Sequence, residues 1–397
     1  MKPEEWIEIQ CKGRCERDRR LLTRAVNTFY KNILQKKEEC ALPWGNSPMI
    51  MPSWAVYRGV WNWDSAFHAM AVSKWDPSLA REQLEFFFKT QREDGCFIDS
   101  CEENGAMTDQ LTKPPVLFWA YVVIDKADPD DTLLSEAYAH FTRNESFWKE
   151  KRSQNGLFFY SSDALEERDV CAKWETGWDT SPRFDHGITE SLWAIDLNCY
   201  MVIAYRALRY MAQRLGLTED AEKWSAEEQA LTKRINERLW SEELGAYCDT
   251  FRDGFSEGSG ATGILTPASF MPLFVTIAPE SYAARMKNLA ADPCKFYPLM
   301  PSCAYDSDQY TQEDYWRGPV WINIAYMAIK GLRNYGFAEL ADTYKENILN
   351  MCDGEERGLF EYYNSRTGVG LGAIDYAWTA AFIIEFILSY ESEEPLI

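Results

Sequence analysis

Apolar residues recur every three or four positions through much of the chain, which is the period of an α-helix with one buried face. Pro, Gly and acidic residues mark the boundaries of these segments. The pattern predicts about twelve helices, at 14–37, 66–74, 77–90, 115–126, 131–151, 188–215, 219–239, 267–274, 279–290, 319–335, 338–351 and 374–390.

The predicted helices fall into close pairs that alternate with longer loops. No long segment alternates with the period of two that a strand requires, although short β pieces are expected near 157–160, 246–251 and 359–363. Six helix pairs can bury their apolar faces by closing into a ring of inner and outer helices. We therefore predict an all-α fold, an (α/α)6 toroid. There is no Ser/Gly-rich linker, so residues 1–397 are predicted to form one domain, with 1–45 as its N-terminal helix and lead-in.

Composition and charge narrow the function classes. The chain is 46% hydrophobic and 26% charged, and it contains no apolar run long enough for a membrane span. The first residues lack a basic segment followed by an apolar one, so we expect a cytoplasmic protein. A formal net charge of −21 repels phosphate backbones and anionic lipid, so neither a nucleic acid nor a membrane is an expected partner.

Metal and cofactor chemistry is not indicated by the cysteines and histidines. The 11 cysteines are scattered without a Cys-x-x-Cys pair, and there are only three histidines. The acidic residues Asp306, Asp308, Glu313 and Asp314 lack the glycine and the terminal glutamate of a calcium loop, so a solvated loop is expected. We predict no cofactor and no metal site.

Aromatic residues make up 15% of the chain, including 16 Trp and 21 Tyr. Some of them fill the core, whereas others suit a surface that stacks on sugar rings. Four clusters at helix boundaries combine aromatic with charged residues, namely YRGVWNWD at 57–64, KWETGWDTSPR at 173–183, YWRGPVW at 315–321 and FEYYN at 360–364. Loops held by a rigid scaffold are frequent positions of binding and catalytic groups.

Two carboxyl groups beside aromatic rings fit the cleavage of a glycosidic bond. That reaction needs one carboxylic acid to protonate the leaving oxygen and a second carboxylate as base or nucleophile. Trp178 next to Asp179 provides an apolar wall of the kind that raises a carboxyl pKa. For Asp64, Asp109 and Glu175, helix capping, arginine pairing and binding of sugar hydroxyls remain alternatives.

Taken together, the four clusters resemble the glycosidases of family 63 and, more distantly, the trehalases that share its barrel. The segment WETGWDTSPRF at 174–184 is similar to the family segment that carries the general acid, which implies that role for Asp179. YWRGPVWIN at 315–323 resembles a strip of the substrate pocket. EYYN at 361–364, with Thr367 and Gly368, resembles the segment of the general base, which implies that role for Glu361.

The resemblance implies an inverting, exo-acting α-glycosidase in which Glu361 activates water and Asp179 protonates the departing oxygen. The expected substrate is a small α-glucoside or α-mannoside, either a glycosylglycerate or a disaccharide. The substrate-binding residues are predicted to be Tyr57, Trp61, Trp63, Asp64, Gln110, Lys113, Trp174, Glu175, Arg183, Tyr315, Trp316, Arg317 and Trp378. Trp119 and Trp321 are expected to pack between helices.

One residue departs from the family pattern. Lys113 precedes two prolines where the family commonly has a glutamine. As a hypothesis, Lys113 could hold a carboxylate on the leaving group together with Arg183 or Arg317. The alternatives are that its side chain points to solvent or pairs with Asp109.

Two other functions fit the same architecture. A sugar epimerase or isomerase commonly transfers protons with histidines, and only His68 lies beside a cluster. A toroid that binds carbohydrate without catalysis is the second alternative. The single histidine beside a cluster disfavours the epimerase, and the presence of both Asp179 and Glu361 in their clusters argues against a protein that only binds carbohydrate.

Overall fold

The computed structural model describes residues 2–34, 45, 47–185, 187–254, 260–392 and 396–397, and these residues are mostly helical. Within them lie fourteen α-helices: α1 (Pro3–Gln10), α2 (Glu16–Lys31), α3 (Asn62–Val72), α4 (Pro77–Lys89), α5 (Leu117–Ala127), α6 (Asp131–Lys151), α7 (Arg168–Thr176), α8 (Ile195–Arg214), α9 (Thr218–Arg238), α10 (Met271–Phe274), α11 (Glu280–Ala291), α12 (Ile322–Asn334), α13 (Ala338–Gly354) and α14 (Ala377–Leu388). Short 3-10 helices span Pro182–Phe184, Thr189–Ser191, Pro267–Phe270 and Tyr315–Arg317.

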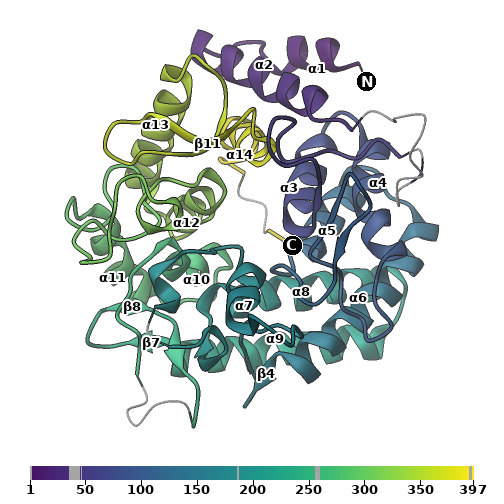
Figure 1. Cartoon of the computed structure of the whole chain (residues 1–397), viewed down its shortest axis with the longest axis vertical. Helices are drawn as coiled ribbons and strands as arrows, with labels where there is room; N and C mark the ends of the chain where they lie inside the picture. The colour runs from purple at the N-terminus through teal and green to yellow at the C-terminus, as the bar shows by residue number, and fades with distance from the viewer. Residues whose placement is uncertain (1, 35–44, 46, 186, 255–259, 393–395) are drawn as a thin grey trace.

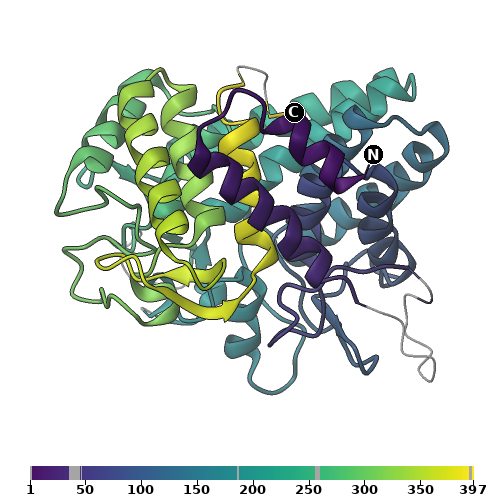
Figure 2. The same ribbon diagram turned by 90° about the horizontal axis from the view of Figure 1, so that it is seen from above.

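Six helices surround the centre of the molecule. Helices α3, α5, α8, α10, α12 and α14 pack each against the next, and α14 packs against α3, so these contacts form a closed circuit. Helices α2, α4, α6, α9, α11 and α13 lie outside them (Figure 1). Helix α2 packs against α14 and α13, and it crosses the outer face of α14 in the second view (Figure 2).

The difference between inner and outer helices follows from their sequences. Every residue of α3 is buried, as are ten of the twelve residues of α14. In contrast, α9 buries only Ala221, Trp224, Leu231 and Ile235, which lie on one face. A helix that is apolar all round is stable only where other elements cover it on all sides. Buried apolar residues from α1 through α14 form one continuous cluster.

Short antiparallel strands join the loops. The strand β1 (Gly59–Trp61) pairs with β2 (Ser100–Glu102), which also pairs with β3 (Met107–Thr108). The strand β10 (Phe360–Tyr363) pairs with β11 (Gly370–Ile374), with an irregularity between Phe360 and Tyr362. The remaining strands form the pairs β4 (Ser153–Gln154) with β5 (Leu157–Phe158), β6 (Leu192–Trp193) with β9 (Thr250–Phe251), and β7 (Trp240–Ser241) with β8 (Ala246–Tyr247).

Helices are present at all twelve predicted positions. At 267–274 the first half is a 3-10 helix and only Met271–Phe274 is α-helical, and the other differences lie at the helix ends. The helix predicted at 14–37 ends at Lys31, because Ile33 forms a β-bridge with Ile50, and 35–37 lie outside the described residues. The helix predicted to begin at 188 begins at Ile195, since a 3-10 turn and β6 precede it. Helices α1 and α7 were not predicted. They are only eight and nine residues long, too short for a clear periodic pattern.

Candidate active site

A cavity at the N-terminal ends of inner helices brings together most of the predicted site residues. Its lining contains Tyr57, Trp61, Trp63, Asp64, Lys113, Gly177, Asp179, Tyr315, Tyr376 and Trp378. Tyr57 and Trp61 precede α3, and Trp63 and Asp64 lie in its first turn. Tyr376 precedes α14, and Trp378 lies in its first turn. Lys113 precedes α5, Gly177 and Asp179 follow α7, and Tyr315 lies in the 3-10 turn before α12. Of these ten, Gly177 and Tyr376 were not among the predicted contacts.

The first segment of the site is fixed by β1. A β-carbon on Gly59 would lie 2.5 Å from the carbonyl oxygen of Cys101, so the pairing of β1 with β2 depends on glycine there. Helix α3 then begins directly after Trp61, and the backbone N–H of Asn62 donates to the carbonyl of Asp99 at 2.9 Å. This arrangement places Asp64 in the first turn of α3, where it accepts a hydrogen bond from the hydroxyl of Tyr376 at 3.5 Å.

Asp179 follows the end of α7. The helix ends at Gly177, which has a φ of +74°, and the adjacent Trp178 is fully buried. The ring of Trp178 stacks on Trp316 at a centroid distance of 4.7 Å, and Trp316 stacks on Trp321 at 3.7 Å. This stack holds the backbone next to Asp179, while Asp179 itself lines the cavity. Burial raises the pKa of Asp179 to about 6, although the nearby Lys113 ammonium opposes that shift.

Glu361 lies in β10 behind the tyrosines of the cavity and is 2% exposed. Its Oε1 accepts hydrogen bonds from the hydroxyls of Tyr315 at 3.1 Å and Tyr57 at 3.3 Å, and its Oε2 accepts from the backbone N–H of Ala373 at 3.0 Å. Burial raises the pKa of Glu361 to about 7, and these three donors oppose the shift. The Asp179 carboxyl raises it further, so the two groups interact electrostatically.

Lys113 is the only cation among the described residues that line the cavity, and it is 7% exposed. Its Nζ lies 3.1 Å from Oδ1 of Asp99 and donates to the carbonyl oxygen of Trp174. Burial alone would lower its pKa, but the carboxylates of Asp99, Asp179 and Asp64 raise it above the ordinary value. The alternatives of a solvent-directed side chain or a pair with Asp109 are wrong, because Lys113 is buried and its partner is Asp99.

Burial also raises the pKa of Asp64 well above its usual range, and Lys113 opposes the shift. Asp99 has a raised pKa for the same reason, with Lys113 again opposing it. Among the described residues, the carboxyl groups of Asp64, Asp99, Asp179 and Glu361 and the ammonium of Lys113 therefore lie in the cavity lining or in contact with it. Asp99 was not singled out in the sequence, because no aromatic cluster surrounds it.

Several predicted contact residues do not line the cavity. Arg183 is fully buried, with its Nη2 2.6 Å from Asp196 and its Nε 2.7 Å from Asp249. Glu175 is also fully buried, 3.1 Å from the guanidinium of Arg152. Arg183 and Glu175 therefore form buried ion pairs that stabilise the loops, and neither side chain lines the cavity, although both were predicted to contact substrate.

The remaining predicted contacts are also absent from the cavity lining. The guanidinium of Arg317 pairs with Asp185 and donates to the Thr180 carbonyl at 2.9 Å. Trp316 is 1% exposed inside the aromatic stack, and the 42% exposed Trp174 contributes only its carbonyl to Lys113. Gln110 is exposed, and its carbonyl accepts from the backbone N–H of Asp163 at 2.7 Å. Trp321, predicted to pack between helices, is buried and stacks on Trp316 of the 3-10 turn and on Tyr362 of β10.

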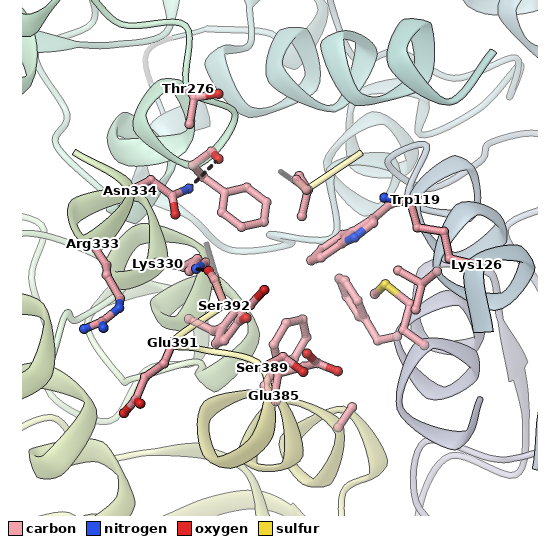
Figure 3. A pocket seen from close by; sticks show the side chains of 18 of the residues that line it. Trp119, Lys126, Thr276, Lys330, Arg333, Asn334, Glu385, Ser389, Glu391 and Ser392 are labelled. Atoms are coloured by element: carbon pink, nitrogen blue, oxygen red, sulfur yellow. Dashed lines mark hydrogen bonds between the residues drawn. The ribbon is translucent and has the colours of Figure 1, made fainter. Parts of the chain in front are cut away.

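A larger cavity, of about 780 Å³, lies at the other end of the ring (Figure 3). Its lining comes from the C-terminal ends of inner helices, including Lys126 of α5, Asn334 of α12 and Glu385 of α14. Trp119 contacts it and packs edge-on against Phe274 with a centroid distance of 5.4 Å. No residue of the four clusters lines this cavity.

The described residues contain neither a membrane span nor a cluster of metal ligands. None of the described helices combines the length and apolar character needed to cross a membrane. In the same part of the chain, no three His, Cys, Asp or Glu side chains are grouped in a way that could hold a metal ion.

Comparison with known proteins identifies the family. The profile of the mannosylglycerate hydrolase MGH1-like glycoside hydrolase domain matches residues 57–379. The mannosylglycerate hydrolase of Rubrobacter radiotolerans is 25% identical, over 85% of this chain and 92% of that protein. These matches confirm the resemblance to family 63 and the prediction of a glycoside hydrolase.

Solved structures agree on the fold. The family 63 mannosylglycerate hydrolase from Thermus thermophilus in complex with glucose superposes with a TM-score of 0.74 at 24% identity, over 92% of this chain and 99% of that chain. The neutral trehalase Nth1 from Saccharomyces cerevisiae gives 0.68 at 17% identity, over 86% of this chain and 73% of that chain. The chain therefore belongs to the mannosylglycerate hydrolase MGH1-like glycoside hydrolases of family 63.

Proposed function

We propose that this glycoside hydrolase cleaves a small α-glucoside or α-mannoside from its non-reducing end with inversion, using Asp179 as general acid and Glu361 as general base. The observation that carries the proposal is the placement of the two carboxyl groups at one aromatic-lined cavity. Asp179 lines it, and Glu361 is hydrogen bonded to Tyr57 and Tyr315, which also line it.

In this mechanism Glu361 takes a proton from a water molecule whose oxygen attacks the anomeric carbon. The bond between that carbon and the leaving oxygen breaks, and Asp179 donates its proton to that oxygen. The tyrosines orient the Glu361 carboxylate, and its raised pKa suits proton transfer near neutral pH. The burial that raises the pKa of Asp179 to about 6 increases its protonated fraction relative to an exposed carboxyl group.

The cavity walls suit one sugar ring. The rings of Trp61, Trp63 and Trp378 provide faces for stacking, and Asp64 provides acceptors for hydroxyl groups. Relatives named as mannosylglycerate hydrolases support a small glycoside as substrate. The leaving group in this proposal is glycerate or a second sugar.

The helical ring is proposed to be an (α/α)6 toroid, with residues 1–397 as one domain. The closed circuit of six inner helices and the single apolar cluster support both statements. An epimerase has less support, because His68 is fully buried away from the cavity lining and burial lowers its pKa to about 3.

The test is a panel of α-glucosides and α-mannosides that includes glycosylglycerates, trehalose and kojibiose. Proton NMR of the first product is expected to show the β-anomer, as inversion requires. Asp179→Asn and Glu361→Gln are each expected to lower kcat by at least about a thousandfold. Near wild-type activity in either variant, or an α-anomer as first product, would contradict the proposal. A product with altered C2 stereochemistry would indicate an epimerase, and binding without turnover would indicate a binding protein.

A further inference from the structure

Asp375 lies between β11 and α14, directly before Tyr376 of the cavity wall. Its φ of +51° belongs to the left-handed region, which residues other than glycine rarely adopt and which Asp and Asn adopt more readily than most. Such a conformation persists where the surrounding structure holds it, and residues of this kind are frequent at functional sites. The contacts of Asp375 therefore show what fixes the start of α14.

The side chain of Asp375 joins the start of α14 to two other segments. Its Oδ2 accepts hydrogen bonds from Nε1 of Trp54 at 3.1 Å and from Nζ of Lys31, the last residue of α2, at 3.0 Å. The Asp375 side chain is 11% exposed, so water competes little for these bonds. The side chain of Lys31 is 58% exposed, and a surface ion pair of this kind contributes little to stability. The bond to Trp54 is the one that leads to the active site, because Trp54 lies three residues before Tyr57.

Asn32, which follows α2 and is fully buried, completes the junction of these segments. Its Nδ2 donates to the carbonyl oxygens of Asp375 at 2.7 Å and Pro52 at 3.1 Å, and its Oδ1 accepts from the backbone N–H of Trp54 at 3.0 Å. The backbone N–H of Ala377 donates to the same Pro52 carbonyl at 2.8 Å. We call Asn32, Trp54 and Asp375 the polar junction. It ties the segment of Pro52 and Trp54 to the start of α14, against which α2 packs (Figure 2).

A short turn leads from the polar junction to Tyr57. The backbone N–H of Tyr57 donates to the carbonyl of Ser53 at 3.0 Å, and the hydroxyl of Ser53 donates to the carbonyl of Ile374 at 2.7 Å. Ile374 is the residue before Asp375, so this bond adds a second connection between the same two segments. The position of Tyr57 therefore depends on the place where β11 meets α14.

Two tyrosines of the cavity wall lie on the two sides of this connection. The rings of Tyr57 and Tyr376 meet edge to face, with a centroid distance of 5.8 Å. The hydroxyl of Tyr57 donates to Glu361 at 3.3 Å, and the hydroxyl of Tyr376 donates to Asp64 at 3.5 Å. A shift of either segment would move a donor away from the proposed base or from the carboxylate proposed to bind sugar hydroxyls.

The three residues of the polar junction do not line the cavity themselves, so they can affect it only through the tyrosines. From these contacts, we infer that Asp375 is a positioning residue: its left-handed backbone and its carboxylate hold Tyr57 and Tyr376 in the cavity wall. The inference rests on the proposed function, because Glu361, the partner of Tyr57, is the proposed base.

Two substitutions separate the backbone of Asp375 from its side chain. Asp375→Gly keeps the left-handed angle, which glycine adopts freely, but removes the acceptor. We expect kcat/KM to fall at least about tenfold, because small displacements of catalytic groups slow a reaction strongly. Asp375→Asn tolerates the angle and offers a carbonyl oxygen to Trp54, so kcat/KM should stay within about threefold of the wild-type value. Full activity in Asp375→Gly, or an equal loss in both variants, would overturn the inference.

Asn155→Gly is the matched control. Asn155 also has a left-handed φ, of +53°, and its side chain donates to Asp253 at 2.8 Å, but it lies in the turn between β4 and β5. This variant should retain the wild-type kcat/KM, and a loss equal to that of Asp375→Gly would contradict a specific role for Asp375.

Trp54→Phe provides a second test if Asp375→Gly does not fold. It removes the indole donor from a side chain that is 45% exposed, and kcat/KM is expected to fall at least about threefold. Wild-type activity in Trp54→Phe would then overturn the inference.

A spectroscopic measurement separates this inference from the proposed hydrolysis. Protein labelled with 13C at the tyrosine Cζ gives NMR signals that Tyr57→Phe, Tyr376→Phe and Tyr282→Phe assign. The Tyr57 and Tyr376 signals are expected to shift in Asp375→Gly and to stay near their wild-type positions in Asp375→Asn. The signal of Tyr282, in the outer helix α11, should stay in place in both variants.

The two possible failures give different results. Shifts of the Tyr57 and Tyr376 signals without hydrolysis of any glycoside would support the inference and overturn only the proposed function. Unchanged signals in Asp375→Gly would overturn the inference, whatever the rate of hydrolysis.

Discussion

The ring of Trp63 occupies the place that a β-carbon on Gly177 would need, with its nearest ring carbon 2.5 Å from that position. Gly177 ends α7 with a φ of +74°, two residues before Asp179, and Trp63 lies in the first turn of α3. The loop of the proposed acid is therefore fitted directly against the helix that carries Asp64.

This contact predicts the effect of Gly177→Ala. The alanine must adopt an unfavourable φ and must also displace an indole ring in the cavity wall. We expect the free energy of unfolding to fall by about 2–4 kcal/mol and kcat/KM to fall at least about tenfold. Urea unfolding and steady-state kinetics measure the two effects.

Gly216 provides a matched control, since its φ is +73° and no atom lies within 4 Å of the place where a β-carbon would be added. Gly216→Ala should lose only about 1 kcal/mol and keep its activity. Equal losses in the two variants would show that the backbone angle, and not the Trp63 contact, dominates at Gly177.

The hydroxyl of Tyr57 should set the pH dependence of the reaction. Tyr57→Phe removes a hydrogen bond that lowers the pKa of Glu361, so this pKa rises and less carboxylate is present near pH 7. We expect kcat/KM to fall about three- to tenfold at pH 6.5 and by a smaller factor at pH 8, where Glu361 is ionised again. The profile of kcat/KM against pH is the measurement.

Tyr376→Phe is the comparison, because its hydroxyl contacts Asp64 instead of Glu361. We expect Tyr376→Phe to change KM, and we expect its kcat/KM to fall by the same factor at every pH. A loss in Tyr57→Phe that is the same at every pH would mean that the hydroxyl contacts the substrate and does not tune the base.

Ionisation of Glu361, the proposed base, should lower the free energy of unfolding at neutral pH. Because the folded-state pKa of Glu361 is about 7, above its ordinary value of 4.5, the folded state binds a proton more tightly than the unfolded state. Stability from this group is present at low pH and is lost as the pH rises through 7. Glu361→Gln does not titrate, so its stability relative to wild type should increase between about pH 4.5 and 7.

The expected gain well above pH 7 is about 3–4 kcal/mol, because the folded-state pKa of about 7 exceeds 4.5 by about 2.5 and each tenfold difference in proton affinity corresponds to about 1.4 kcal/mol. Urea unfolding of both proteins at pH 5 and pH 8 measures it. A difference that is independent of pH would show that packing or hydrogen bonding, and not ionisation, separates the two proteins.

The buried group of Arg183, Asp196 and Asp249 should be necessary for folding. Arg183→Met leaves two carboxylates buried without a cation, and we expect about 3–5 kcal/mol of lost stability. Adding Asp196→Asn and Asp249→Asn to the same protein should recover part of that loss, because amides are neutral.

The exposed pair of Arg20 and Asp353 is the reference, with Arg20 47% exposed. Arg20→Met should leave the free energy of unfolding almost unchanged, as for other surface pairs. Chemical unfolding compares the variants, and a cost for Arg183→Met as small as that for Arg20→Met would contradict the structural role.

The sequence alone determined the helical content, because apolar positions in helices such as α2 and α9 recur with the period of one buried face. It also indicated Asp179 and Glu361, since each lies in a cluster of aromatic and charged residues with a recognisable order. Short elements such as α7 were not predictable, because nine residues give too few turns to establish a period.

Only the tertiary structure decided which members of the clusters reach the cavity. Asp179 and Arg183 lie four positions apart, yet the first lines the cavity and the second pairs with Asp196 and Asp249, which other elements carry. Likewise, Lys113 pairs with Asp99 and not with Asp109, although Asp109 is closer to it in the sequence. The direction of a loop side chain depends on charges and rings that other elements bring to it. No local pattern contains that information, and so the residues of the motifs were predictable while their contacts were not.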